Sequence, residues 1–179
     1  MRVALIVIII TFFGCQKDNT ETIQSKPLEV SDNEIINYIS YCNNRFDACF
    51  DYPSNFGAQP EPANGDGRTF LNELDSAQIV MYGFLDDNNE GLKTQINILN
   101  EYLEIEKLTD IPNGYELIGK DKESGKIHKE RILIKPDSSA GKYKDGKPMN
   151  IIYSLQFVYP QTKEKKYQNY WHKMTEKFN

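Results

Sequence analysis

The chain has 179 residues, and its 26 acidic side chains outnumber its 21 basic ones, which gives a formal net charge of −5. This balance argues against a nucleic-acid-binding protein, since phosphate binding requires a concentrated basic surface. The length suits one domain with an apolar core.

An apolar segment begins the chain. Met1-Arg2 supplies a positive end, and Thr11 is the only polar residue among the 11 from Val3 to Phe13. A stable membrane-spanning helix needs about 20 apolar residues, so this run is too short to be one. A positive start, a brief apolar core and a small residue before a cut site are typical of a secretory signal. Residues 1–14 are therefore predicted to be a signal peptide.

The stretch Phe12-Phe13-Gly14-Cys15 resembles a bacterial lipobox, where a diacylglycerol is attached to the Cys thiol and the chain is cut before it. Gly14 fits that pattern, while the two phenylalanines are bulkier than the usual residues. The resemblance implies that Cys15 is the lipid-modified first residue of the mature protein. Two or three acyl chains hold a protein on a membrane far better than one, at about 0.8 kcal/mol per buried methylene. Cleavage removes Arg2, and the mature chain has a net charge of −6.

The next four residues, Gln16, Lys17, Asp18 and Asn19, resemble the Lys-plus-acidic signal by which Bacteroidetes lipoproteins are exported to the cell surface. Asn19 stands where a second acidic residue would strengthen the match. The alternative is that this is the polar start of a linker, with the protein on an inner leaflet that faces the periplasm. The resemblance implies a lipoprotein of the outer membrane that faces the cell surface.

Residues 15–30 have few large apolar side chains, are rich in Thr, Lys, Glu and Gln, and contain Pro27. Such a segment buries too little apolar surface to fold, so it is predicted to be a flexible tether, with a span on the order of 20 Å. Residues 31–179 are then the single globular domain.

Two further cysteines, Cys42 and Cys49, are an even pair in an oxidising compartment and are expected to be joined. Strand-like runs flank residues 43–47, and a turn centred between Arg45 and Phe46 places the two cysteines opposite each other. Antiparallel pairs bring Cα atoms to about 4.5–5.5 Å, which suits a disulfide. The spacing is not C-x-x-C and the chain has only two histidines, which argues against a redox or metal role.

The order of elements predicts an α+β fold. After the cysteine hairpin and a long Gly- and Pro-rich loop, the patterns predict strands at 69–71 and 77–83, a helix at 91–106, strands at 115–120, 126–135 and 150–159, and a C-terminal helix. The strand at 150–159 is the most β-rich and should be central. The Met-and-aromatic stripe of the last helix is predicted to be core. We expect a largely antiparallel sheet packed between helices.

Three motifs resemble a known superfamily. Cys42-Asn43-x-Arg45-Phe46-x-x-Cys49-x-x-Tyr52-Pro53, then Pro60-x-x-x-Asn64-Gly65-Asp66-Gly67-Arg68-x-Phe70, then Val80-x-Tyr82-Gly83 are similar to a class of small secreted bacterial proteins. That class in turn resembles the PsbP-like superfamily. The resemblance covers roughly residues 38–178 and implies an α/β/α sandwich with a binding or accessory role, but no single chemistry. Asp47 stands where Gly would normally follow Phe46.

The stretch Asn64, Gly65, Asp66, Gly67 and Arg68 is the most distinctive. In a structural interpretation both glycines take positive φ, Asp66 bonds the loop's own amides, and Arg68 pairs with a carboxylate or carbonyl. Alternatively the loop is a recognition surface, or a Ca²⁺ site to which Asp86-Asp87 adds ligands. Calcium needs six to eight ordered oxygens, which the following residues do not supply.

No plausible catalytic set stands out. His128 lies in an alternating charged strand and His172 lies beside core Trp171, settings where a histidine is usually solvated or satisfied. No Gly-rich phosphate loop opens a helix. Carboxylate pairs that converge in the fold are not visible in a sequence. No cofactor or metal is predicted.

The leading hypothesis is a non-enzymatic, lipid-anchored binding or accessory protein of the bacterial envelope, with an envelope partner of unknown identity. The second is an immunity or inhibitor protein, since an acidic lipoprotein suits binding a basic toxin. The third is a hydrolase of envelope glycans.

Overall fold

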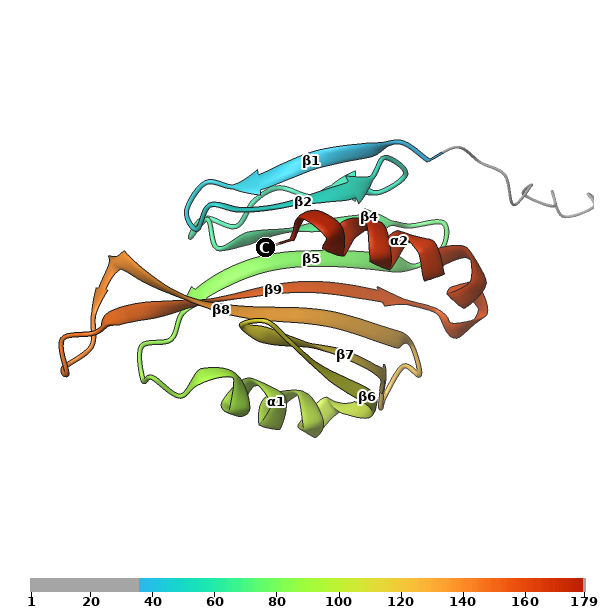
Figure 1. Ribbon diagram of the computed structural model, residues 1–179. Coiled ribbons are helices and arrows are strands. Elements are labelled where there is room, and N and C mark those ends of the chain that lie inside the picture. The colour runs from blue at the N-terminus through green and yellow to red at the C-terminus, as the bar shows by residue number, and fades with distance from the viewer. Residues whose placement is uncertain (1–35, 179) are drawn as a thin grey trace, which may run out of the picture. The chain divides into compact units, whose positions relative to one another are not determined.

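Strand β9 (Pro148–Tyr159) lies in the middle of a seven-stranded antiparallel sheet (Figure 1). The computed structural model describes residues 36–178. The strand order is β3-β4-β5-β9-β8-β7-β6, and β1 and β2 form a separate two-stranded sheet. The elements are β1 (Tyr38–Asn43), β2 (Ala48–Pro53), β3 (Gly57–Ala58), β4 (Gly67–Asn72), β5 (Ala77–Leu85), α1 (Gly91–Tyr102), β6 (Leu103–Ile111), β7 (Gly114–Asp121), β8 (Ile127–Lys142), β9, the 3₁₀ turn η1 (Gln161–Lys163) and α2 (Glu164–Lys177).

Alternation along β9 assigns each residue to one layer, because neighbouring side chains of a strand point to opposite faces. Leu155 and Phe157 belong to the larger core, which also contains residues of the β1–β2 hairpin and of α2. Ile152 belongs to a second core with residues of α1 and of β7. The hairpin and α2 therefore cover one face of the sheet, and α1 lies on the other. The predicted α+β class, the central strand and the C-terminal helix are confirmed.

The larger core is built around aromatic side chains. Phe157 contacts Tyr159 and Tyr167, with ring centroids 4.7 and 5.1 Å away, in the tilted and edge-on geometries that aromatic pairs prefer. The stripe on α2 is buried as predicted: Tyr167, Tyr170, Trp171, Met174 and Phe178.

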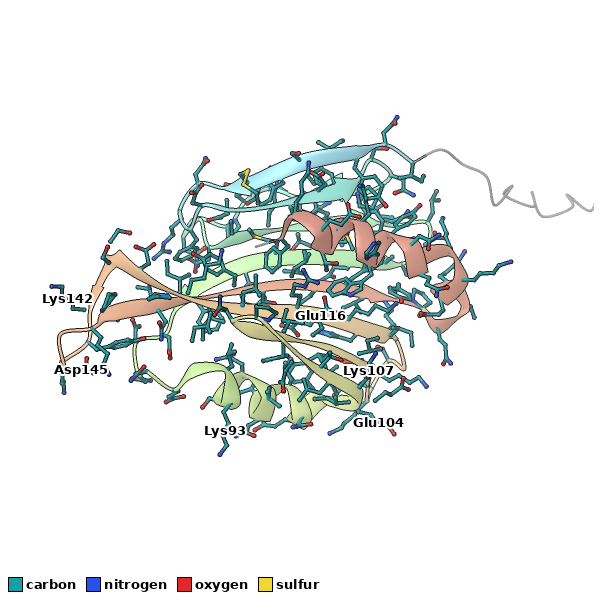
Figure 2. All side chains as sticks on the ribbon, in the orientation of Figure 1. Lys93, Glu104, Lys107, Glu116, Lys142 and Asp145 are labelled. Atoms are coloured by element: carbon teal, nitrogen blue, oxygen red, sulfur yellow. A yellow bond between two sulfur atoms is a disulfide. The ribbon has the colours of Figure 1, made fainter. Side chains whose placement is uncertain are left out.

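The prediction of a helix over residues 91–106 was wrong at its C-terminal end. Helix α1 ends at Tyr102, and Leu103 is already extended, with φ −108° and ψ 142°. Residues 103–111 form β6, which pairs with β7. Leu103 fits both a helical and a strand period, so its spacing alone did not decide. The labelled Glu104 and Lys107 project from β6 (Figure 2), and such exposed charges are typical of a protected sheet edge.

The predictions for the signal peptide, Cys15, the export signal at residues 16–19 and the tether all lie outside the described residues. Within residues 36–178, neither helix is long and apolar enough to cross a membrane.

A buried carboxylate fixes the start of α2 against the turn between β4 and β5. Asp75 accepts hydrogen bonds from Tyr167 at 2.7 Å and from Lys166, and Lys163 lies 2.8 Å away. Burial alone would raise the pKa of Asp75, but the hydrogen bonds from the two lysines and the tyrosine outweigh it. They hold this pKa well below its ordinary value of 3.8. The contribution to stability is thus fully present above that value and is lost as the pH falls below it.

We predict that Asp75→Asn lowers the free energy of unfolding by about 1.5–3 kcal/mol at neutral pH, as expected for hydrogen bonds to a charged group. The difference from wild type should shrink below pH 3.8, because Asp75 then takes up a proton in the unfolded wild-type chain while it stays ionised in the folded one. Urea unfolding at several pH values measures both. Asp145→Asn is the control, since Asp145 pairs with the exposed Lys147 and should change stability by less than about 1 kcal/mol.

Candidate functional site

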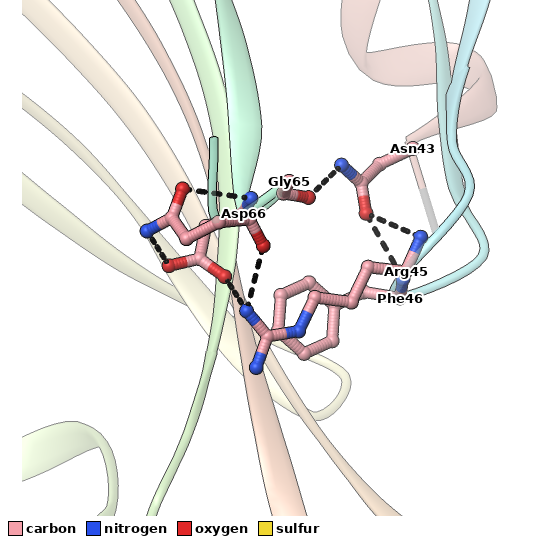
Figure 3. Close-up of polar contacts among 6 residues, drawn as sticks. Asn43, Arg45, Phe46, Gly65 and Asp66 are labelled. Carbon is pink, nitrogen blue, oxygen red and sulfur yellow. Dashed lines mark hydrogen bonds and ion pairs between the residues drawn. The ribbon is translucent and has the colours of Figure 1, made fainter. Parts of the chain in front are cut away.

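The three motifs meet at the turn of the β1–β2 hairpin, and Figure 3 shows the contacts of the first two, with Asn43 and Arg45 directed toward Gly65 and Asp66. Phe46, at the tip, packs on Gly83 of β5. A Cβ atom on Gly83 would lie 2.7 Å from the Phe46 ring, so only glycine allows this contact. The backbone amide of Gly83 donates to the Asp66 carbonyl at 2.8 Å. The hairpin, the loop and β5 are therefore joined at one place.

Polar bonds from the hairpin hold the loop in position. Asn43 donates its side-chain amide to the Gly65 carbonyl at 2.8 Å. Arg45 donates to the Asn64 carbonyl at 2.9 Å and forms an ion pair with Asp66. We call this set of contacts the clamp.

The hairpin is itself braced on both sides of its turn. The side-chain oxygen of Asn43 accepts hydrogen bonds from the backbone amides of Arg45 and Phe46. Cys42 and Cys49 are paired across the strands with Cα atoms 4.1 Å apart, which confirms the predicted disulfide and its register. Asp47 takes a φ of 52°, the left-handed conformation that Gly adopts more readily and Asp tolerates. The clamp residues thus sit on a rigid turn.

The expected backbone of the loop needs two corrections. Gly65 does take a positive φ of 67°, but Gly67 does not. Gly67 is needed for space, because a Cβ there would lie 2.0 Å from the Met81 carbonyl oxygen. Asp66 does not bond the loop's own amides through its side chain; it pairs with Arg45 and accepts from the Asn64 side-chain amide. A sequence could not reveal this, since Arg45 lies in the turn of the separate β1–β2 hairpin.

Arg68 has partners of both expected kinds. Its Nε donates to the Gln59 carbonyl at 2.6 Å, and its guanidinium lies 3.9 Å from the Glu61 carboxylate. It also lies over the ring of Tyr41, 5.9 Å from the centroid. Both charged residues of the loop are therefore engaged within the protein.

A pocket of about 360 Å³ lies beside this loop. The loop supplies one wall, and the floor is formed by β4 and β5, where Thr69, Val80 and Tyr82 alternate with residues of the larger core such as Met81. The lining residues are Gln59, Pro60, Pro62, Asn64, Asp66, Gly67, Arg68, Thr69, Val80, Met81 and Tyr82. This volume is near the lower end of the range for small-molecule sites, about 300–1,000 Å³.

The structure does not bring the proposed calcium ligands together. Asp86 accepts the backbone amides of Glu90 and Gly91 at the start of α1, at 2.9 and 3.2 Å. In the part of the chain from residue 36 to 178, no three His, Cys, Asp or Glu side chains are grouped to hold a metal ion.

A buried polar cluster lies on the same sheet face as the pocket, next to Tyr82. Glu130 of β8 is fully buried and accepts hydrogen bonds from Ser154 at 2.6 Å, Gln156 at 3.1 Å and His128 at 2.9 Å. Gln156 also donates to the Tyr82 hydroxyl at 3.3 Å. Burial in the first place, and then the Glu130 charge, raises the pKa of Tyr82 to about 12. The cluster thus ends at the floor of the pocket.

Sequence reasoning identified His128 alone from this cluster, as a solvated or satisfied residue, and the structure shows it bonded to Glu130. The sequence signal for this cluster was the spacing of two residues that places His128 and Glu130 on one face of a strand, and Ser154 and Gln156 on one face of another. Which strands lie side by side decides whether these residues meet.

The cluster is not arranged for nucleophilic catalysis. Glu130 lies between Ser154 and His128, so the histidine does not reach the hydroxyl that it would have to activate. Ser154 is fully buried. The other histidine, His172, is exposed on α2 and lies 3.6 Å from Glu176.

No protein-family model matches the chain, and no curated protein matches it in sequence. A similar solved structure is the solution structure of cyanobacterial PsbP (CyanoP) from Synechocystis sp. PCC 6803, a protein of the superfamily that the motifs resemble. The TM-score is 0.47 and the sequence identity 10%, over 86% of this chain and 99% of CyanoP. At this level of similarity neither a ligand nor an activity transfers.

The two loop glycines should respond differently to substitution. We predict that Gly65→Ala costs about 1–2 kcal/mol of stability, because its positive φ is strained for an L-residue although the space around it is open. Gly67→Ala should cost more, since β4 and β5 must separate to admit a methyl group. Gly65→Asn should cost less than Gly65→Ala, because Asn tolerates a positive φ, whereas Gly67→Asn should cost no less than Gly67→Ala. Thermal melts of the variants test this; equal losses at both positions would contradict the assignment.

Proposed function

We propose that this protein is a non-enzymatic, lipid-anchored binding or accessory module of the bacterial cell envelope, and that the pocket beside the clamp is its binding site. The observation that carries the proposal is the fixed pocket wall. The loop has no regular structure over most of its length, yet it is held by Asn43, Arg45 and the Gly83 amide. A preformed wall lowers the ordering cost of binding, which favours recognition.

The lipid anchor supports an envelope location. The lipobox-like residues before Cys15 provide the attachment point, and the disulfide between Cys42 and Cys49 suits an oxidising compartment outside the cytoplasm. A tethered domain with a small pocket is suited to holding a ligand or partner close to the membrane.

We expect Cys15→Ser to abolish lipid attachment and to leave the protein uncut or released from the membrane. Mass spectrometry of the N-terminus and membrane fractionation measure the two effects. The folded domain should melt at the wild-type temperature, because Cys15 belongs to the segment predicted from the sequence to be a tether. An unlipidated wild-type N-terminus would contradict the anchor.

Blocking the pocket should remove binding of an envelope component. Val80 lies on the pocket floor, and Gln78 is exposed two residues earlier on the same face of β5, outside the lining. The immobilised mature protein should capture a component from envelope extracts in a saturable manner. We predict that Val80→Arg weakens capture at least about tenfold, the effect of a lost central contact, and that Gln78→Arg leaves it within about twofold. Equal capture by both variants would contradict a site in the pocket.

A further inference from the structure

We propose that the pocket binds an uncharged carbohydrate, with one sugar ring lying on Tyr82. This inference rests on the proposed function and names the chemical class of the ligand. Three features of the pocket support it: its charges are already paired, its floor offers an apolar platform, and its remaining polar groups are neutral.

The charged side chains of the lining are satisfied inside the protein. Asp66 is paired with Arg45, and Arg68 donates to the Gln59 carbonyl and lies close to Glu61. The Glu61 carboxylate beside Arg68 would repel an anionic ligand, and a cationic ligand would compete with Arg45 for Asp66. A neutral ligand leaves both pairs intact, so it avoids leaving a desolvated charge without a partner.

The floor provides a flat apolar surface. Tyr82 is half-buried and is stacked on Phe84, with ring centroids 6.0 Å apart and an interplanar angle of 20°. Val80 lies beside it, and Pro60 and Pro62 line the loop side of the pocket. The C–H faces of a sugar ring carry weak positive charge and pack well on the negative face of an aromatic ring.

The orientation of Tyr82 is fixed from behind. Its hydroxyl accepts from Gln156, which also donates to the buried Glu130. Glu130 is in turn held by Ser154 and His128. The buried cluster, which has no role in the pocket wall, therefore anchors the platform and lowers the entropic cost of stacking on it.

The other polar groups of the lining suit hydroxyl partners. Thr69 has a hydroxyl and Gln59 a side-chain amide, whose nitrogen donates to the Gly57 carbonyl at 3.2 Å and whose oxygen is an uncharged acceptor. Both groups suit hydrogen bonds with sugar hydroxyls. A peptide would need unpaired backbone groups for strand addition. At this floor β4 is paired with β5, and the backbone N–H of Gln59 already donates to the Thr69 carbonyl at 2.8 Å.

The extract experiment can separate this inference from the proposed function. Periodate cleaves the vicinal diols of sugars, so periodate-treated extract should lose the component that Val80→Arg fails to capture, and protease-treated extract should retain it. Capture that depends on the pocket but survives periodate and is lost to protease would overturn the carbohydrate inference and leave the proposed function standing. Capture that does not depend on the pocket would overturn both.

Direct binding gives the second test. On an array of neutral, sulfated and sialylated oligosaccharides, the mature protein should bind only neutral members. By titration calorimetry, the affinity for the best of these should not change between about 50 and 500 mM sodium chloride, since there is no ligand charge to screen. Binding confined to charged members, no binding, or a strong salt dependence would overturn the inference.

Variants locate the sugar on the platform. Tyr82→Ala should weaken binding at least about tenfold and Tyr82→Phe only about two- to fivefold, because the ring remains and only its anchor is lost. Thr69→Val should weaken binding about fivefold, the effect of one hydrogen bond, while the matched Thr109→Val on exposed β6 should have no effect. Equal loss in Tyr82→Phe and Tyr82→Ala with unchanged melting temperatures would overturn stacking on the ring.

Discussion

The pocket depends on one contact region, where the turn of the β1–β2 hairpin meets the loop at residues 64–66 and β5. Phe46 fills the space that the missing side chain of Gly83 leaves, and the ion pair of Arg45 with Asp66 lies beside it. Without these contacts the loop would keep few bonds to the sheet, and a loop without partners does not hold a fixed shape. The position of the wall is therefore a property of the hairpin as much as of the loop.

The disulfide has its clearest role in this context. It closes a short loop, for which the expected stabilisation is modest, about 2–3 kcal/mol. The two cysteines, however, flank the turn that carries Asn43 and Arg45. The disulfide restricts the conformation of the hairpin and so keeps the side chains of Asn43 and Arg45 directed toward the loop. A local crosslink thus supports contacts with residues about 20 positions away in sequence.

On the face of the sheet opposite the larger core, β9 connects the Glu130 cluster to Tyr82 of the pocket. Strand β9 contributes core residues to one layer and Ser154 and Gln156 to the other. Glu130 would be costly at this depth if its oxygens were unpaired, and β9 supplies two of its three donors. Gln156 then links this buried group to Tyr82, so the interior of the protein fixes a side chain that faces solvent.

Local pattern alone determined much of this protein: the strand alternation of residues 150–159, the buried stripe of α2 and the register of Cys42 with Cys49 are all encoded by neighbours in sequence. The period of side chains within one element depends only on local backbone geometry. The end of α1 was not determined in this way, because Leu103 fits either period until β7 pairs with it. The clamp and the Glu130 cluster were decided by tertiary structure alone, since each joins strands whose adjacency is set by the packing of the whole sheet. The pairing of Asp66 with Arg45 of the hairpin depends on this packing. The pocket that Asp66 lines depends on it as well.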